Sequence, residues 1–405
     1  CIYKVIVGFM MKINKVQVIS FIFSLCTSVD LISVMGFRLT LIPLIIYGIF
    51  ILINKRTIDK NIWYVLFFFL LCTPSLFYTY DIGKSVGYLF WIIFNFIFIS
   101  CVFKSLAQED YYQTLQGVMN SYRVQIVIGA ILYILHIQER AHVLYYEPSY
   151  FAISLIPYVV LVLASLLKQN HSLPTPAARP LDLFLCLVAI VTTKSANLIL
   201  IFLIGFLILS LYGRRKLLKV AVTLVFASIA FMCLYFYAKE NNDLIAITFK
   251  NIFMSDNVTQ ALIERAGNRW YRVEMAYDVA LQHFWGVGIG AYTEFTLNNK
   301  SSYPYYSSLP WYLNPFGLPA ISLYIEMAAT CGWLALIVWL AWHYKMLFSK
   351  HVSSAKGSVI FFSLIISMLI LIIESSFMRP YYWALIGICL AHSDKKYFPR
   401  RIRND

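Results

Sequence analysis

The chain has 405 residues, of which 60% are hydrophobic and only 13% are charged, and its mean hydropathy is +0.72. A soluble domain carries about 25% charged residues, so this composition excludes an ordinary soluble protein and indicates an integral membrane protein. The formal net charge of +14 does not indicate a nucleic-acid partner, because the basic residues follow a pattern of membrane topology.

Apolar windows of roughly 17–25 residues are expected to cross a bilayer as α-helices. The sequence therefore predicts an all-α, polytopic bundle of about 12 transmembrane helices, joined by short polar connections and one large loop. The expected spans cover residues 16–33, 39–54, 62–78, 86–104, 122–138, 149–168, 181–193, 196–212, 218–238, 318–344, 358–375 and 380–393.

Lysine and arginine are more frequent in cytoplasmic loops than in external ones. Most of the 33 basic residues fall in alternate connections and at the chain ends, which places both termini in the cytoplasm and the large loop outside. We predict an N-terminal transmembrane bundle over residues 1–238, a large outer loop over 239–317, and C-terminal transmembrane helices with a basic cytoplasmic tail over 318–405. A positive segment before the first apolar run predicts a natural start at Met10 or Met11.

The eight cysteines form no CxxC motif, and seven of them fall in or beside apolar runs. Such cysteines are usually small packing residues. The sequence therefore predicts neither a disulfide framework nor a metal site, and it suggests no cofactor.

The outer loop contains three arginines, Arg265, Arg269 and Arg272, at helical spacing. On a helix over 258–284 they share a face with His283, while the acidic residues project from another sector. Unpaired arginines suit phosphate oxygens, so we predict an anion site; the alternative is an amphipathic surface helix with solvated charges. The apolar sector of this helix is expected to contain Leu262, Val273, Tyr277, Ala280 and Phe284.

Glycines follow this segment in the order Gly286-Val-Gly288-Ile-Gly290. A dinucleotide-binding loop would follow a strand and open a helix, whereas this motif follows an expected helix outside the membrane. We therefore reject a nucleotide site. We expect a tight turn with exposed backbone N–H groups, in which Gly286 and Gly288 take part in substrate binding.

A second candidate constellation is Glu147-Pro148-Ser149, on the outer side before the span 149–168. Proline suits the first turn of a helix, which puts Glu147 at the helix entrance. Its carboxylate either caps that entrance or accepts a proton from a substrate hydroxyl. Ser149, with Arg140 and Lys194 from neighbouring outer segments, is a candidate substrate-binding residue, although a lone lysine at a span boundary is often a membrane-interface anchor.

Further polar and aromatic residues are candidates for a functional role or a structural one. Glu326 and Glu374 are acids in or near apolar runs, where ionisable groups are often functional, and Arg379 follows them. Aromatic residues gather at the end of the outer loop, where they form either a membrane-interface belt or stacking platforms for sugar rings. These aromatic residues are Tyr303, Tyr305, Tyr306, Trp311, Tyr312 and Phe316.

Together these features resemble the bacterial O-antigen polymerases (Wzy type) of the O-antigen ligase/polymerase superfamily. The resemblance rests on the number of spans, on Glu147-Pro148-Ser149, and on Arg269-Trp270 leading to Gly288. It also includes an apolar run with Glu326 and Cys331-Gly332-Trp333. The ligases carry a histidine near the end of the large loop, but residues 314–321 contain none, which favours a polymerase.

The resemblance implies a glycosyltransferase of the bacterial inner membrane. It would join two undecaprenyl-pyrophosphate-linked oligosaccharides at the periplasmic face during lipopolysaccharide biosynthesis, within a lipid membrane and with a chain-length-regulating co-polymerase as partner. In this reaction Glu147 is the expected base, and Arg269 and Arg272 would stabilise the leaving pyrophosphate without a metal, with Arg265 as a third contact. An O-antigen ligase and a lipid-linked oligosaccharide flippase remain alternatives.

Overall fold

The computed structural model describes residues 14–30, 33–34, 37–55, 59–169, 173–212, 266–348, 358–375 and 377–391, with scattered positions between 221 and 263. Met10, Met11, Arg265 and most of the expected span 218–238 lie outside the described residues. Within them the chain is helical, apart from one antiparallel pair of two-residue strands. The expected all-α class therefore agrees with the structure.

The number of membrane-crossing helices stays a prediction. Within the described ranges, two continuous helical segments are long and apolar enough to cross a membrane, Ile82–Glu109 and Tyr111–Ile134. A third is the bent pair Pro148–Ser154 and Ile156–Leu166, if its two parts form one span. Most of the other expected spans appear as shorter apolar helices of 10–17 residues.

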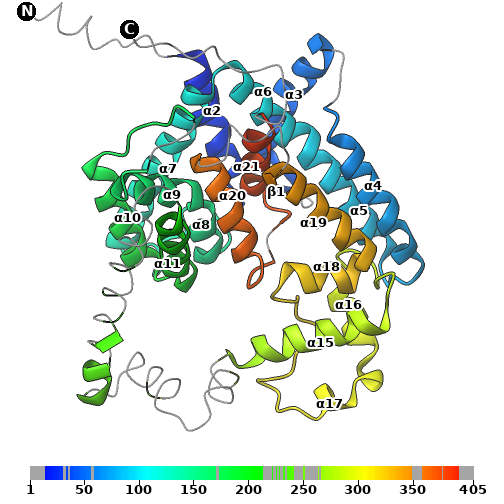
Figure 1. Cartoon of the computed structure of the whole chain (residues 1–405). Helices are drawn as coiled ribbons and strands as arrows, with labels where there is room; N and C mark the ends of the chain where they lie inside the picture. The colour runs from blue at the N-terminus through cyan, green and yellow to red at the C-terminus, as the bar shows by residue number, and fades with distance from the viewer. Residues whose placement is uncertain are drawn as a thin grey trace, which may run out of the picture.

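The first half of the chain forms most of the bundle in Figure 1, where α2 packs on α7 and the paired strands follow α2. Residues 82–109 are one continuous helical segment with a π-helical stretch at its centre. The elements are α2 (Lys15–Thr27), β1 (Ser33–Val34), β2 (Phe37–Arg38), η1 (Leu39–Leu41), α3 (Ile42–Lys55), α4 (Ile62–Cys72), η2 (Thr73–Phe77), α5 (Ile82–Phe94), η3 (Asn95–Ser100), α6 (Cys101–Glu109) and α7 (Tyr111–Ile134).

The middle of the chain continues the bundle with a helix that bends. The axes of α8 and α9 differ by 49°, and Pro157, near the start of α9, lacks the amide that would continue the hydrogen-bonded ladder. Helix α11 packs on α9 and on the later α20. The elements are α8 (Pro148–Ser154), α9 (Ile156–Leu166), α10 (Pro180–Thr193) and α11 (Ala196–Leu211).

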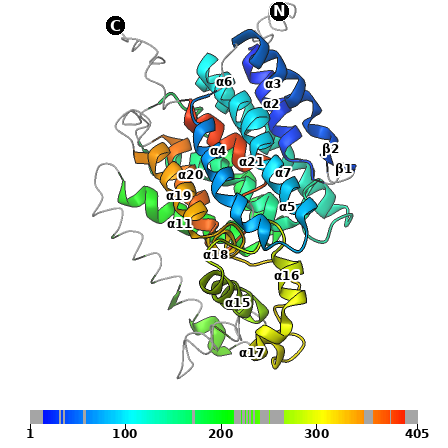
Figure 2. The same ribbon diagram turned by 90° about the vertical axis from the view of Figure 1, so that its right-hand side faces the viewer.

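The outer-loop helices form a separate layer at one end of the bundle. Figures 1 and 2 both place α15 below α18, and α17 on the side of α15 that faces away from the bundle. The elements of the outer loop are α15 (Asn268–Gln282), α16 (Tyr292–Asn298), η4 (Lys300–Ser302) and α17 (Pro304–Ser307). The chain then continues with α18 (Leu323–Cys331), α19 (Trp333–Phe348), α20 (Val359–Ile370) and α21 (Pro380–Leu390).

The expected single span 318–344 appears as two helices, α18 and α19, because the chain breaks at Gly332. Gly332 has a φ of +90°, and an added Cβ would lie 2.7 Å from the carbonyl oxygen of Phe284. Only glycine adopts this conformation without strain. The break lets the Trp333 indole donate to the Ala280 carbonyl at 2.9 Å, so it fastens the end of α15 to the bundle.

Candidate functional site

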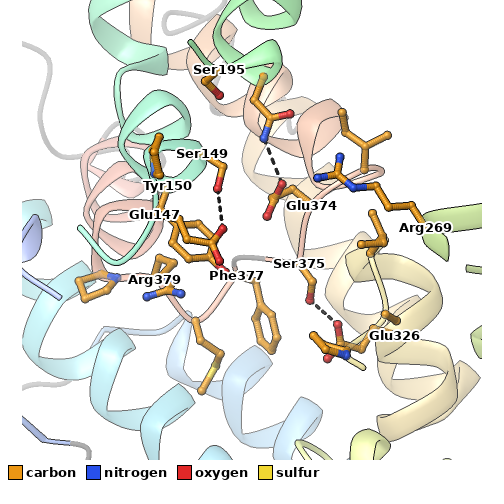
Figure 3. A pocket seen from close by; sticks show the side chains of 18 of the residues that line it. Glu147, Ser149, Tyr150, Ser195, Arg269, Glu326, Glu374, Ser375, Phe377 and Arg379 are labelled. Atoms are coloured by element: carbon orange, nitrogen blue, oxygen red, sulfur yellow. Dashed lines mark hydrogen bonds between the residues drawn. The ribbon is translucent and has the colours of Figure 1, made fainter. Parts of the chain in front are cut away.

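A cavity of about 980 Å³ opens where the outer-loop layer meets the bundle (Figure 3). Its walls come from α5, the entrance of α8, the turn between α10 and α11, the first turn of α15, and the segments before α18 and after α20. Six of its lining residues are cationic and three are acidic. These are Arg38, Arg140, Lys194, Arg269, Arg272 and Arg379, and Glu147, Glu326 and Glu374.

Helix α15 supplies two of the predicted arginines to this cavity. The helix begins at Asn268, directly after Gly267, whose φ of +57° ends any continuous helix from upstream residues. Arg272 is half-buried, and its Nε donates to the Pro319 carbonyl at 2.7 Å while a second guanidinium nitrogen contacts the same oxygen. Burial and then the neighbouring Arg269 guanidinium lower the pKa of Arg272. An anion placed between the two arginines would relieve both effects.

Arg269 lies one turn before Arg272 and remains exposed, and its side chain points into the cavity towards Glu374 in Figure 3. It forms no hydrogen bond or ion pair within the ranges that the structure describes. A guanidinium in this state keeps its planar donor fork for a ligand.

The buried face of α15 shares only Ala280 with the described part of the predicted apolar sector, and Leu262 lies outside the described residues. It consists of Met275, Ala276, Val279 and Ala280, which pack against α18, whereas Tyr277 and Phe284 are exposed. The helix ends before His283, whose ring contacts Phe295 edge-on at 5.0 Å and does not line the cavity. Burial lowers the pKa of His283. The predicted place of His283 beside the arginines is therefore wrong, because it assumed that the helix continues past Gln282.

The glycine turn after α15 packs against α18 instead of exposing its amides. The Val287 amide donates to the Ala329 carbonyl at 2.9 Å, and the Gly288 amide donates to the Thr330 carbonyl at 3.0 Å. An added Cβ on Gly286 would lie 2.3 Å from the Thr330 oxygen, and one on Gly288 would lie 2.4 Å from Thr79. The expectation of exposed amides is wrong. Gly286 and Gly288 lie outside the cavity lining, in a close backbone contact that holds α15 in place.

Glu147 lies at the entrance of α8, and the prediction that Pro148 opens this helix is confirmed. Its side chain forms no capping hydrogen bond to the described backbone; instead it accepts from the Ser149 hydroxyl at 3.1 Å. Both residues line the cavity. The carboxylate is therefore available to a hydroxyl in the cavity.

Arg140, in the connection between α7 and α8, and Lys194, in the turn between α10 and α11, both line the cavity. The Arg140 Nε donates to the Thr193 carbonyl at 3.0 Å, and its Nη2 donates to the Lys194 carbonyl at 3.1 Å. The Lys194 ammonium lies 5.1 Å from the centre of the Tyr133 ring. Arg140 thus holds the turn that presents Lys194.

The structure adds charged residues that were weak site candidates, or none, on sequence grounds. Arg38 and Arg379 both bind the buried Asp30 carboxylate, at 2.8 and 3.0 Å, and the Arg379 guanidinium lies 3.8 Å above the Tyr150 ring. Asp30 and Arg38 flank an expected span boundary, and this was the only sequence signal for them. Two arginines on one carboxylate leave one positive charge in excess at this side of the cavity.

The acids Glu374 and Glu326 also line the cavity. Glu374 accepts from the Asn197 amide at 3.0 Å, and Glu326 accepts from the Ser375 hydroxyl (Figure 3). Their position in or near apolar runs was the sequence signal that singled them out.

Residues 182–340 match the family model described as O-antigen ligase. The match is consistent with the O-antigen ligase/polymerase superfamily. No curated protein matches the chain.

The O-antigen ligase match begins in α10 and ends in α19, so it includes Lys194, Arg269, Arg272 and Glu326. Glu147 and Arg379 come from the helices on either side of the matched residues. The cavity is therefore built jointly by the matched segment and the rest of the bundle. The family and the apolar helices together indicate a membrane protein.

Proposed function

We propose that the chain is an O-antigen polymerase of the bacterial inner membrane. It transfers an oligosaccharide from undecaprenyl pyrophosphate to another lipid-linked repeat unit at the periplasmic face. The observation that supports this proposal is that Glu147, Arg269 and Arg272, from distant parts of the sequence, line the same cavity.

The cavity contains the groups that this transfer requires. A hydroxyl oxygen of the acceptor sugar forms a bond to the anomeric carbon of the donor, and the bond from that carbon to the pyrophosphate oxygen breaks. Glu147 takes the hydroxyl proton, which contributes about 100- to 10,000-fold to the rate of such steps. The electron pair leaves with undecaprenyl pyrophosphate.

Arg269 and Arg272 act on the leaving group. Negative charge develops on the pyrophosphate oxygens as the bond breaks, and fixed cations nearby stabilise that charge. Arg272 is held by the Pro319 carbonyl, and Arg269 is free to donate to the phosphate. The two guanidiniums supply positive charge in the place where a divalent cation would otherwise act, so we propose a metal-independent reaction.

The matched family model is described as O-antigen ligase, so a ligase that transfers finished polymer to lipid A-core is the second candidate. Two observations favour the polymerase. Residues 314–321 contain no histidine. In addition, the described residues that line the cavity include no histidine, and His283 packs on Phe295 instead.

A strain that lacks its own polymerase tests the assignment. Expression of the wild-type chain should restore the lipopolysaccharide ladder, whereas Arg269→Ala should leave core capped with a single repeat unit at an equal protein level. Lys300→Ala is the matched control, because it removes an exposed outer-loop cation that does not line the cavity. A normal ladder from Arg269→Ala contradicts the assignment.

Deletion of the gene from its natural host separates the alternatives. Loss of a polymerase leaves core with one repeat unit. Loss of a ligase leaves unsubstituted core with polymer still on the lipid carrier. Loss of a lipid-linked oligosaccharide flippase leaves single repeat units on the carrier at the cytoplasmic side.

A further inference from the structure

The cavity is too small to hold a polymeric product. Its volume of about 980 Å³ lies at the upper end of the roughly 300–1,000 Å³ that is usual for pockets for drug-sized ligands. A polysaccharide of several repeat units must therefore extend past the cavity and over the outer surface of the protein. This consequence rests on the proposed function.

Exposed aromatic side chains lie on the outer-loop layer where such a chain would pass. Tyr305, Trp311 and Tyr312 are 54%, 88% and 58% exposed, and the half-buried Tyr271 lies against Tyr305, with ring centres 6.5 Å apart. We call these four residues the aromatic surface. Trp311 and Tyr312 form a second pair, with ring centres 6.0 Å apart, and large exposed apolar groups on one surface often mark interaction sites.

A membrane-interface belt does not account for the aromatic surface. Such belts lie where spans leave the bilayer. Figures 1 and 2 both place α17 beyond α15, on the side away from the helical bundle. Tyr305 belongs to α17, and Trp311 and Tyr312 follow it. These exposed rings therefore belong to the part of the outer-loop layer that lies farther from the bundle than α15.

Tyr305, one member of the aromatic surface, packs against a buried and hydrogen-bonded neighbour. Tyr306, next to Tyr305, is buried, and its hydroxyl donates to the Asp278 carboxylate of α15. The rings of Tyr305 and Tyr306 meet edge-on with centres 5.0 Å apart. A fixed aromatic face binds a ligand with a small loss of side-chain entropy.

The aromatic surface begins one residue away from the cavity lining. Tyr271 precedes Arg272 on α15, and Arg272 lines the cavity and donates to the Pro319 carbonyl. The Tyr271 ring in turn lies against Tyr305. A saccharide chain that leaves the cavity beside Arg272 therefore has a short path to Tyr271 and Tyr305.

We propose that the aromatic surface binds the saccharide chain of the lipid-linked substrate outside the cavity. The C–H faces of sugar rings pack on aromatic faces, and the phenol hydroxyls exchange hydrogen bonds with sugar hydroxyls. This site binds the sugar rings of the polysaccharide. The pyrophosphate of the lipid-linked substrate binds in the cavity instead.

Binding of free polysaccharide to the full-length protein in lipid nanodiscs tests this proposal. The probe is the O-antigen polysaccharide of the source strain, released from lipopolysaccharide by mild acid, so that it carries no pyrophosphate. Trp311→Ala and the double variant Tyr305→Ala/Tyr312→Ala should each raise the Kd about tenfold, which corresponds to ~1.4 kcal/mol. Trp63→Ala is the matched control, because Trp63 is 70% exposed but lies on α4 in the bundle.

The outcomes separate this proposal from the proposed function. Arg269→Ala should bind the free polysaccharide like the wild type, because the probe lacks the pyrophosphate. If Arg269→Ala makes a normal ladder while Trp311→Ala loses polysaccharide binding, the cavity assignment fails and the aromatic surface stands. Equal binding by wild type, Trp311→Ala and the double variant overturns the saccharide site, and so does a wild-type protein that does not bind the probe.

Discussion

The entrance of α8 and the first turn of α15 face the same cavity but hold their charged groups in different ways. On α15, Arg272 is tied to the Pro319 carbonyl, and the turn at Gly286 and Gly288 bonds to the backbone of α18. On α8, Glu147 is exposed, and its one side-chain hydrogen bond within the described residues is with Ser149. The difference is that the positive charge of Arg272 is fixed before substrate arrives, while the carboxylate can adjust to the hydroxyl that it deprotonates.

Removing the free arginine should have the largest effect. Arg269→Ala is expected to lower the polymerisation rate about 100- to 1,000-fold, because a cationic donor to the leaving group is lost. Arg269 has no bonded partner in the described part of the chain, so folding should not suffer. The turnover of lipid-linked repeat units by the purified protein measures this effect. A loss of less than tenfold would contradict the role of Arg269 at the leaving group.

Removing the proposed base should have the next largest effect. Glu147→Gln preserves the shape and the contact with Ser149 but cannot accept a proton, so we expect about a 100-fold lower rate. Full activity would instead assign proton acceptance to another acid of the cavity, such as Glu374.

A conservative change at the tied arginine should have a moderate effect. Arg272→Lys keeps the positive charge but loses the planar fork that grips the Pro319 carbonyl, so we expect a rate about tenfold lower. Arg272→Ala is the matched variant and should fall further. If the two variants are equally impaired, fixed geometry and not charge is what Arg272 supplies.

Removing the hydrogen bond from Ser149 to the Glu147 carboxylate should have the smallest effect. Ser149→Ala removes one hydrogen bond to Glu147, and a bond of this kind contributes ~0.7 kcal/mol, or roughly threefold in rate. The initial polymerisation rate of Ser149→Ala, measured in parallel with that of Glu147→Gln, tests this expected threefold loss. A loss as large as that of Glu147→Gln would contradict an adjustable carboxylate.

Several elements of the fold were predictable because their signals are local. Pro148 and Pro180 each open a helix, and the expected spans 181–193 and 196–212 correspond closely to α10 and α11. The break at Gly332 was not predictable, since its positive φ serves a contact with Phe284 that exists only in the folded chain. The same applies to the end of α15, which is set by the turn against α18.

The candidate site was predictable where charged or polar residues interrupt a largely apolar sequence. Glu147, Ser149, Arg140, Lys194, Arg269 and Arg272 were all singled out in the sequence, and all line the cavity. Arg38 was missed, and Arg379 was given little weight. Their shared partner Asp30 lies 349 positions from Arg379 in the chain, and a single sequence holds no signal for such a pairing.

The most direct test of the account is the release of undecaprenyl pyrophosphate by the purified protein from lipid-linked repeat units. We expect release to accompany the formation of saccharides of increasing length, and Glu147→Gln and Arg269→Ala to abolish both products together. Polymer formation and undecaprenyl pyrophosphate release at the wild-type rate in both variants would contradict it.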